Sequence, residues 1–405
     1  MPRRIAALLL ALVTAAAACS GDEASTSSPT SVATTEASTE PVELAPEDDI
    51  YALAEDLPPG EPGEVIAVQE VEGLDVDATV LRVLYHSQSI AGEDIAVSGL
   101  MAVPAGPAPA GGRPVISWAH GTTGIADMCA PSKDPASAGV GLLAPLLERG
   151  VVFVATDYEG LGTPGRHPYL AGQSEGRAVL DIARAARSLG DEVGASEQLV
   201  IWGHSQGGHA ALFANQIAPQ WAPELEVLGT VAGAPPSHLN LLAGALRDSP
   251  FRFYLAYITA GWEAAYPEAD PADVLTPAGL ERLDLVDTAC SGDLAGAWND
   301  LPYDELVKAD PAAVEPWASL LVENDPGFVA GAAPVLIIHG GADEQIPTVS
   351  SELLLARMCG VGQVVERRVY PGESHGGVVL PALADMVAWI DGRLAGNEPP
   401  TSCPS

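Results

Sequence analysis

The chain has 405 residues, of which 47% are hydrophobic, and its formal net charge is −36 at pH 7. This length suffices for one large domain with a single core, or for two or three ordinary domains. The strong negative charge argues against a nucleic-acid partner and against electrostatic adsorption to anionic lipid, because both surfaces attract Lys and Arg. Two explanations of the acidity stay open, a GC-rich genome and a hydrated acidic surface that keeps a protein soluble in high salt.

The N-terminus has the pattern of an export signal. Two arginines precede an apolar segment that is too short to cross a membrane as a mature helix, so we expect a signal peptide over residues 1–18. Cys19 follows at once and predicts a bacterial lipoprotein signal, with membrane attachment through an acylated Cys19. Cleavage by ordinary signal peptidase is the alternative. Residues 19–48, rich in Ser, Thr and acidic residues, are predicted to form a disordered tether.

The cysteines beyond the tether indicate disulfide bonds. An even number in an exported chain favours two disulfides, for which three connectivities are possible. Four free buried thiols are the alternative. The four are Cys129, Cys290, Cys359 and Cys403.

The order of predicted elements indicates an α/β fold over residues 49–405. Strands are predicted over 65–71, 79–85, 95–103, 114–119, 151–156, 199–202, 227–232, 333–338 and 364–370, and helices over 174–189, 206–217, 349–358 and 378–394. The first three strands are expected to be antiparallel at a sheet edge. The later strands alternate with helices, which predicts a mostly parallel, doubly wound sheet with helices on both faces.

One long segment interrupts this alternation. Residues 235–332 are rich in proline and helix-like in patches, and an insertion of this size between two strands indicates a largely helical cap. Six aromatic residues lie between positions 251 and 266, where they either line a substrate pocket or fill the core of the cap. They are Phe251, Phe253, Tyr254, Tyr257, Trp262 and Tyr266.

The motif G-x-S-x-G, typical of the nucleophile in α/β-hydrolases, occurs three times, at Ser174, Ser205 and Ser374. Only Ser205 has an apolar strand before it and a helix after it, the context of a nucleophile elbow that holds the hydroxyl exposed on a strained turn. Ser174 follows a loop and is better interpreted as a helix N-cap, with Glu175 in the first turn. Ser374 fails because His375 is the last histidine, which rules out the order Ser, Asp, His.

Both partners of a catalytic triad follow Ser205 in the order that this fold uses. His375 lies after the last predicted strand and before the final helix, and is the predicted general base. Asp343 lies on a glycine-containing loop at the carboxyl end of strand 333–338, where open α/β sheets place their sites. Asp157 also ends a strand but precedes the serine, so we expect it to make turn and cap hydrogen bonds.

The oxyanion of an acyl-transfer intermediate needs backbone N–H donors. Gln206 supplies the first, at the positive end of its helix. The His-Gly loop after strand 114–119 supplies the second, with Thr122 the first choice and Thr123 the alternative.

Nothing in the sequence predicts a metal or a cofactor. His204 and His209 are five residues apart, the wrong spacing for ligands on one helix face, and we expect them to pack at the elbow and on the helix surface. The sequence contains no phosphate-binding loop, no dinucleotide fingerprint and no zinc-protease motif.

Several stretches together resemble the secretory lipase (lipase A-type) family of the α/β-hydrolase superfamily. They are residues 118–124, 129–132, 157–162, 174–181 and 203–209, and the resemblance covers about residues 60–403. It implies an α/β-hydrolase fold with a largely helical cap, and hydrolysis of esters, often acylglycerols, with the acyl chain under that cap.

The family pattern also implies roles for particular residues. Its triad corresponds to Ser205, Asp343 and His375. The family pairs its cysteines in sequence order, which implies the disulfides Cys129–Cys290 and Cys359–Cys403. We therefore expect an exported serine carboxylic-ester hydrolase, a lipase or esterase, that forms an acyl-enzyme on a small-molecule or lipid ester. A serine peptidase or amidase on the same fold is one alternative, and a non-catalytic surface-binding lipoprotein is another.

Overall fold

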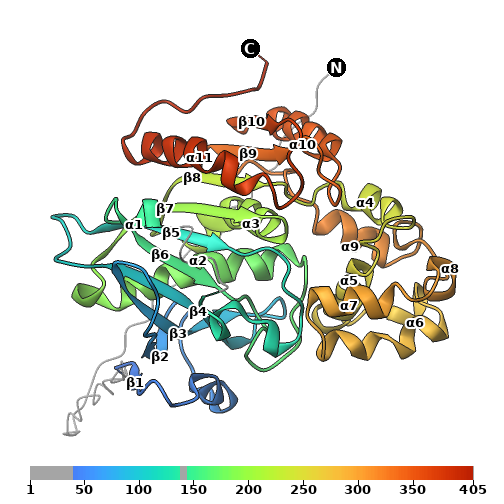
Figure 1. The fold of residues 1–405 in the computed structure, drawn as a ribbon, viewed down its shortest axis with the longest axis horizontal. Coiled ribbons are helices and arrows are strands. Elements are labelled where there is room, and N and C mark those ends of the chain that lie inside the picture. The colour runs from blue at the N-terminus through green and yellow to red at the C-terminus, as the bar shows by residue number, and fades with distance from the viewer. Residues whose placement is uncertain (1–39, 137–143, 405) are drawn as a thin grey trace, which may run out of the picture. The chain divides into compact units, whose positions relative to one another are not determined.

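The computed structural model describes residues 40–136 and 144–404 (Figure 1). The predicted signal peptide, Cys19 and most of the predicted tether lie outside these residues. Among the residues that the structure describes, no helix combines the length and the apolar character needed to cross a bilayer.

A ten-stranded sheet lies at the centre of the fold, in the order β1-β2-β3-β4-β6-β5-β7-β8-β9-β10. The strands are β1 (Val42–Leu44), β2 (Val65–Glu70), β3 (Ala78–Gln88), β4 (Asp94–Pro104), β5 (Arg113–Ala119), β6 (Val152–Thr156), β7 (Ala195–His204), β8 (Glu226–Gly233), β9 (Val335–Gly340) and β10 (Val365–Tyr370). The pairs β2–β3, β3–β4 and β4–β6 are antiparallel, and the other pairs are parallel. The predicted antiparallel strands and the mostly parallel sheet are confirmed.

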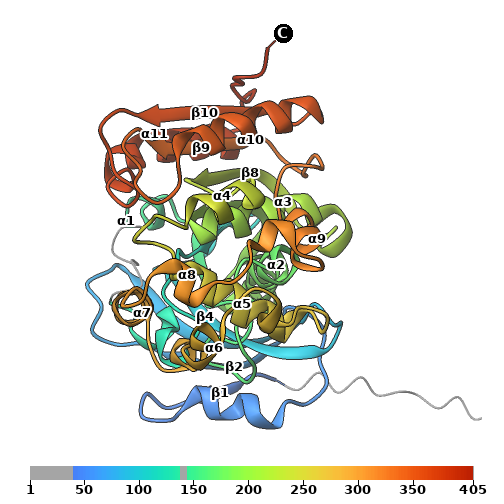
Figure 2. The same ribbon diagram turned by 90° about the vertical axis from the view of Figure 1, so that its right-hand side faces the viewer.

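Helices cover both faces of this sheet (Figures 1 and 2). They are α1 (Ala144–Leu147), α2 (Gly172–Ser188), α3 (Gln206–Trp221), α10 (Thr348–Gly360) and α11 (Val379–Leu394). Successive side chains of a strand point to opposite faces. Ile201 of β7 accordingly packs in the cluster with α2 and α3, whereas Val200 and Trp202 pack in the cluster with α1 and α11. The four predicted helices correspond to α2, α3, α10 and α11.

Short 3-10 helices complete the described elements. They are Ile50–Asp56, Asp127–Cys129, Pro131–Lys133, Gly190–Glu192, Pro271–Asp273, Leu283–Asp287 and Pro311–Ala313. Strand β1, before the first of these 3-10 helices, shows that regular structure begins earlier than predicted. β1 pairs in parallel with β2, and the Gln69 side chain donates to the carbonyls of Ala45 and Asp48 at 2.7 and 2.8 Å. The predicted tether is therefore wrong in its last residues, because composition does not reveal a three-residue strand that the sheet recruits.

The segment between β8 and β9 folds into helices that lie together on one side of the sheet, at the right of Figure 1. They are α4 (Leu239–Ala245), α5 (Tyr254–Ala265), α6 (Pro277–Glu281), α7 (Ser291–Trp298), α8 (Tyr303–Leu306) and α9 (Trp317–Glu323). Three fully buried tryptophans, Trp262, Trp298 and Trp317, give this cap a core of its own. The predicted aromatic group serves mainly that core.

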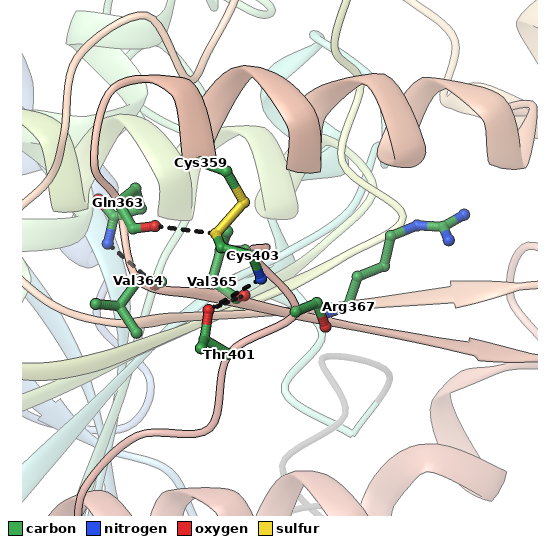
Figure 3. The surroundings of a disulfide bond; sticks show 8 residues. Cys359, Gln363, Val364, Val365, Arg367, Thr401 and Cys403 are labelled. Atoms are coloured by element: carbon green, nitrogen blue, oxygen red, sulfur yellow. Dashed lines mark hydrogen bonds between the residues drawn. A yellow bond between two sulfur atoms is a disulfide. The ribbon is translucent and has the colours of Figure 1, made fainter. Parts of the chain in front are cut away.

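Two disulfides join distant parts of the chain, with the pairing that the family resemblance implies. Cys129–Cys290 connects the loop after β5 to the N-terminus of α7, across 161 residues. Cys359–Cys403 connects the end of α10 to the C-terminal tail (Figure 3). The tail also runs beside β10, where Ser402 donates its N–H to the carbonyl of Val365 at 2.8 Å and accepts from the N–H of Arg367 at 3.0 Å.

Candidate active site

Ser205 occupies the sharp turn between β7 and α3. Its backbone has φ 58° and ψ −123°, a conformation that costs energy in a residue other than glycine and that marks functional turns. The turn tolerates no side chain on either flank. A Cβ on Gly203 would lie 2.0 Å from the carbonyl oxygen of Gly207, and a Cβ on Gly207 would lie 1.8 Å from that of Ala119. The predicted nucleophile thus sits on the strained elbow that the motif indicates.

The predicted acid and base form a hydrogen-bonded pair. Asp343 follows β9 and His375 follows β10, and parallel neighbours place both loops at the same edge of the sheet. His375 Nδ1 lies 2.7 Å from Asp343 Oδ2. Because a carboxylate only accepts, Nδ1 carries the hydrogen and Nε2 keeps its lone pair. Within the described chain, His375 Nε2 has no hydrogen-bond partner, so it is free to take a proton.

The surroundings of Asp343 keep its carboxylate ionised. The backbone N–H groups of Gln345 and Ile346 donate to Oδ1 at 2.9 and 2.8 Å, and His339 Nε2 lies 3.1 Å from Oδ2. Burial alone would raise the pKa of Asp343, but the hydrogen bonds from His339 and His375 outweigh it and hold the pKa well below its usual range. Asp343 therefore stays negative beside His375 and can stabilise a positive charge on that ring.

His204 links the elbow to the base. Its ring packs against the ring of His375, with centroids 4.8 Å apart. Burial, and then the neighbouring His375, lower the pKa of His204 to about 3, so it stays neutral and adds no charge to the site. No hydrogen bond joins Ser205 directly to His375 among the described residues. Catalytic hydrogen bonds of this kind are often long without substrate and shorten in the complex.

Three backbone N–H groups near Ser205 have no hydrogen-bond partner in the part of the chain that the structure describes, namely those of Gln206, Thr122 and Thr123. The loop that carries the threonines packs against the nucleophile, since a Cβ on Gly121 would lie 3.6 Å from that of Ser205. The Thr122 hydroxyl lies 2.7 Å from the Tyr169 hydroxyl. The carbonyls of both threonines accept from Ser291 of the cap, that of Thr122 from the hydroxyl at 3.3 Å and that of Thr123 from the backbone N–H at 2.9 Å.

Ser205 opens onto a cavity of about 350 Å³ between the sheet edge and the cap. This volume lies within the range typical of ligand sites. Most of the wall is apolar. It comes from α4 and the residues that follow it, from α5, from the loop after Asp343 and from the chain before α2. The lining includes Tyr169, Leu170, Pro236, Leu239, Leu242, Ala243, Leu246, Tyr254, Ile258, Leu321, Ile346 and Pro347, with Asp248 and Glu344 as its ionisable members.

Two sequence interpretations near the site are wrong. Helix α2 begins at Gly172 with Ala171 as its N-cap, and Ser174 instead donates its hydroxyl to the buried Glu159 carboxylate. His209 is not on the helix surface but fully buried, with its ring bonded at both nitrogens. Sequence reasoning also missed Glu175 as the partner of His209. The signal that could have revealed this pair is an ionisable residue on the apolar face of each helix, Glu175 in α2 and His209 in α3.

Asp157 plays the part expected of it. Its carboxylate accepts from the Ser98 hydroxyl at 2.6 Å and from the backbone N–H of Ser132 at 2.9 Å, which ties the chain after β6 to its neighbours. It makes no hydrogen bond with His375. In residues 40–136 and 144–404, no group of three or more His, Cys, Asp or Glu side chains is arranged to hold a metal ion.

Comparison with known proteins places this site in a family. The model of the secretory lipase family matches residues 136–402. The chain belongs to the secretory lipase family. It is 28% identical over 301 residues to a secreted triacylglycerol lipase of Malassezia globosa, a match that covers 69% of this chain and 65% of the relative. It is also 28% identical over 279 residues to lipase 4 of Candida albicans, covering 65% of this chain and 59% of the relative. The chain thus spans about three fifths of the length of these relatives.

Solved structures confirm the fold. Candida antarctica lipase A superposes with a TM-score of 0.73 at 22% identity, over 85% of this chain and 84% of that one. The rice cell wall degrading esterase LipA of Xanthomonas oryzae superposes with a TM-score of 0.68 at 19% identity, over 84% of this chain and all of that one. The expected α/β-hydrolase fold with a largely helical cap is therefore correct.

Proposed function

We propose that the protein is an exported hydrolase of carboxylic esters, a lipase or esterase, with Ser205 as nucleophile. The observation that carries the proposal is the strained Ser205 elbow at the mouth of an apolar cavity, next to the Asp343–His375 pair. Relatives named secreted lipases support both the chemistry and the export.

The reaction follows from the positions of the hydrogens. Ser205 Oγ attacks the ester carbonyl carbon while His375 Nε2 takes its proton, and Asp343 stabilises the charged imidazole. The tetrahedral intermediate collapses, the carbon–oxygen bond to the alcohol breaks, and His375 returns the proton to the leaving alcohol. Water then attacks the acyl-enzyme with the same proton transfers, which releases the carboxylic acid and restores Ser205.

The unpaired backbone N–H groups of Gln206 and Thr122 are the proposed donors to the oxyanion. The negative oxygen exists only in the tetrahedral species, so donors fixed beside it lower the barrier without tightening substrate binding. We assign Thr122 rather than Thr123 because the Thr122 hydroxyl contacts Tyr169, a residue of the cavity wall. The bonds from Ser291 of the cap do not distinguish the two, since the carbonyls of both threonines accept from that residue.

The cavity supports an acyl chain as the group bound beside Ser205. Its wall is largely apolar, with leucines from several segments, and apolar walls favour hydrocarbon over a peptide backbone, whose buried N–H and carbonyl groups need partners.

Purified protein assayed with nitrophenyl esters of increasing acyl length, and with the matching anilides, tests the proposal. We expect ester turnover, much weaker anilide turnover, and labelling of Ser205 by a fluorophosphonate. Ser205→Ala should fold, label no longer, and lose turnover. Ester turnover retained in that variant would contradict the assignment of the nucleophile. Preferred anilides would indicate an amidase, and absence of labelling in the wild type would indicate a binding protein.

Attachment through Cys19 is a separate proposal. Cys19 directly follows the apolar segment of the predicted signal, as in lipoprotein signals, and a lipid there would retain the enzyme at the outer face of the cell membrane. Mass spectrometry of the mature N-terminus tests it. A diacylated Cys19 is expected, and an unmodified N-terminus at or near this position would contradict it.

A further inference from the structure

A second carboxylate–histidine pair lies beside the elbow, away from the Asp343–His375 pair. Glu175 of α2 and His209 of α3 are both fully buried, with His209 Nδ1 2.8 Å from Glu175 Oε2. Burying an ionisable group is costly unless its hydrogen-bonding capacity is satisfied. Neither residue reaches the cavity beside Ser205, so the pair has a purpose other than contact with substrate.

The other carboxylate oxygen of Glu175, Oε1, accepts a hydrogen bond from Gln206, the residue after Ser205. Oε1 accepts from the backbone N–H of Leu170 at 3.0 Å and from the side-chain amide of Gln206 at 2.8 Å. The same amide nitrogen donates to His167 Nε2 at 2.8 Å. His167 Nδ1 donates to the carbonyl of Glu159, which leaves Nε2 as the acceptor. Both amide hydrogens of Gln206 are therefore engaged.

His209 provides a second hydrogen-bonded connection from the start of α3. It lies three residues after Gln206, so both side chains project from one face of the first turn of α3. Its Nε2 lies 2.7 Å from the carbonyl oxygen of Asn324, at the end of cap helix α9. One carboxylate thus ties the start of α3 to α2 and, through His209, to the cap.

We propose that Glu175 is a positioning residue for the proposed ester hydrolysis, because it fixes the first turn of α3 and so aims the Gln206 N–H at the oxyanion. This inference rests on the proposed function. Glu175 touches no reacting atom, and its proposed effect reaches the transition state through the position of Gln206 at the start of α3. Misplacing one catalytic group by about 1 Å can cost as much as 10²-fold in rate, which sets the scale of the expected effect.

The hydrogen positions allow a sharp choice of variants. His209 Nε2 faces a carbonyl and must donate, so beside an uncharged side chain at position 175 a neutral His209 offers a lone pair at Nδ1. Glutamine at position 175 can donate to that lone pair and keeps a carbonyl for Leu170 and Gln206. Glu175→Gln therefore allows every contact of the network to remain, whereas Glu175→Ala removes the three contacts that Glu175 makes, with Leu170, Gln206 and His209. Gln206→Met keeps the Glu175–His209 pair and the backbone N–H but releases the side chain.

Ser174→Ala provides a matched control on the same helix. Ser174 is buried one residue before Glu175 and donates to another buried carboxylate, that of Glu159, but contacts neither Gln206 nor His209. Its removal should lower stability without releasing the start of α3.

Steady-state hydrolysis of a soluble nitrophenyl ester, with Tm measured in parallel, tests the inference. We expect Glu175→Ala and Gln206→Met to lower kcat by about 10- to 100-fold at nearly constant KM. Glu175→Gln should restore most of the loss, and Ser174→Ala should keep kcat within about twofold. If Glu175→Ala does not fold, Gln206→Met decides alone.

Two results would contradict the proposal that Glu175 is a positioning residue. One is an equal loss of kcat in Ser174→Ala and Gln206→Met at equal loss of Tm, which indicates general destabilisation. The other is a rise in KM at constant kcat, which indicates a role in binding. Either result with an active wild type leaves the proposed function intact. An inactive wild type contradicts the proposed function itself.

Discussion

Two carboxylate–histidine pairs lie near Ser205. They differ in the environment of Nε2, the histidine nitrogen that does not contact the carboxylate. The Nδ1–oxygen distance is 2.7 Å in Asp343–His375 and 2.8 Å in Glu175–His209. In the first pair the remaining nitrogen has no partner among the described residues, whereas in the second it binds the carbonyl of Asn324. The same two functional groups thus provide a base in one place and a structural tie in the other.

The elements that carry the two pairs explain why one histidine nitrogen stays unbonded and the other does not. Asp343 and His375 lie on loops at the carboxyl ends of β9 and β10, facing the cavity side of the sheet edge. Glu175 and His209 project from α2 and α3, which pack against each other along their length. A helix pair fixes both partners and excludes solvent, while loops on a rigid sheet leave one nitrogen open for chemistry.

The largest contrast is expected from replacing each histidine by glutamine. His375→Gln removes the proposed base and should lower kcat by about 10⁴- to 10⁶-fold. In His209→Gln the glutamine side chain reaches either Glu175 or Asn324, so one of the two hydrogen bonds is lost. This loss should lower kcat by at most about 10²-fold. Steady-state kinetics on one ester measures both, with Tm as the folding control. Equal losses would mean that the two pairs do not have the distinct roles described.

Asp343→Asn should lower kcat by about 10⁴-fold, because an amide donates to Nδ1 and turns the imidazole into the wrong tautomer. KM should change little, since Asp343 does not contact the substrate. The fluorophosphonate labelling rate of Ser205 should fall in parallel. Activity within tenfold of the wild type would show that another group orients His375.

The smallest expected effect is a decrease in the free energy of unfolding as the pH falls. One neutral histidine flanks each pair, and burial lowers the pKa of His204 to about 3 and that of His167 to about 4. Below about pH 6.5 the unfolded chain protonates both histidines and the folded chain does not, so the free energy of unfolding falls as pH drops. Asp343 contributes nothing in this range, because its depressed pKa keeps it ionised.

Urea unfolding at pH 7 and pH 5 checks this dependence. Two such histidines should lower the free energy of unfolding by roughly 3 kcal/mol over that interval, and Asp181, whose pKa burial raises to about 6, should offset about 1 kcal/mol of this loss. His167→Gln should remove about half of the contribution of the histidines. An equal pH dependence in the wild type and in His167→Gln would contradict the lowered pKa of His167.

The proposed triad could be located from the sequence because its signals are local. Ser205 carries its strand, its turn and its helix within a dozen residues, and Asp343 and His375 each follow an apolar strand in the order that the fold requires. Parallel strands then bring the three together without further information, since their carboxyl ends share one edge. The disulfide pairing, in contrast, came from family resemblance alone.

The Glu175–His209 pair was not predictable in this way. Each is an ionisable residue on the buried face of its helix, and their contact depends on how α2 and α3 rotate against each other. Periodicity gives the face of each helix but not the register between them. The placement of His209 on the helix surface failed for that reason, and so did the assignment of Ser174 as an N-cap, where Gly172 extended the helix backwards.

The C-terminal tail seen in Figure 3 has a consequence for solubility. An exposed outer strand offers unpaired N–H and carbonyl groups to any other strand, which is a common route to aggregation. Here residues 401–403 occupy part of the free edge of β10, and the Cys359–Cys403 bond keeps them there. At the opposite edge, β1 is only three residues long and offers a poor template. For a protein that we propose acts outside the cell, beyond the reach of cytoplasmic chaperones, the tail would thus protect against strand-by-strand association.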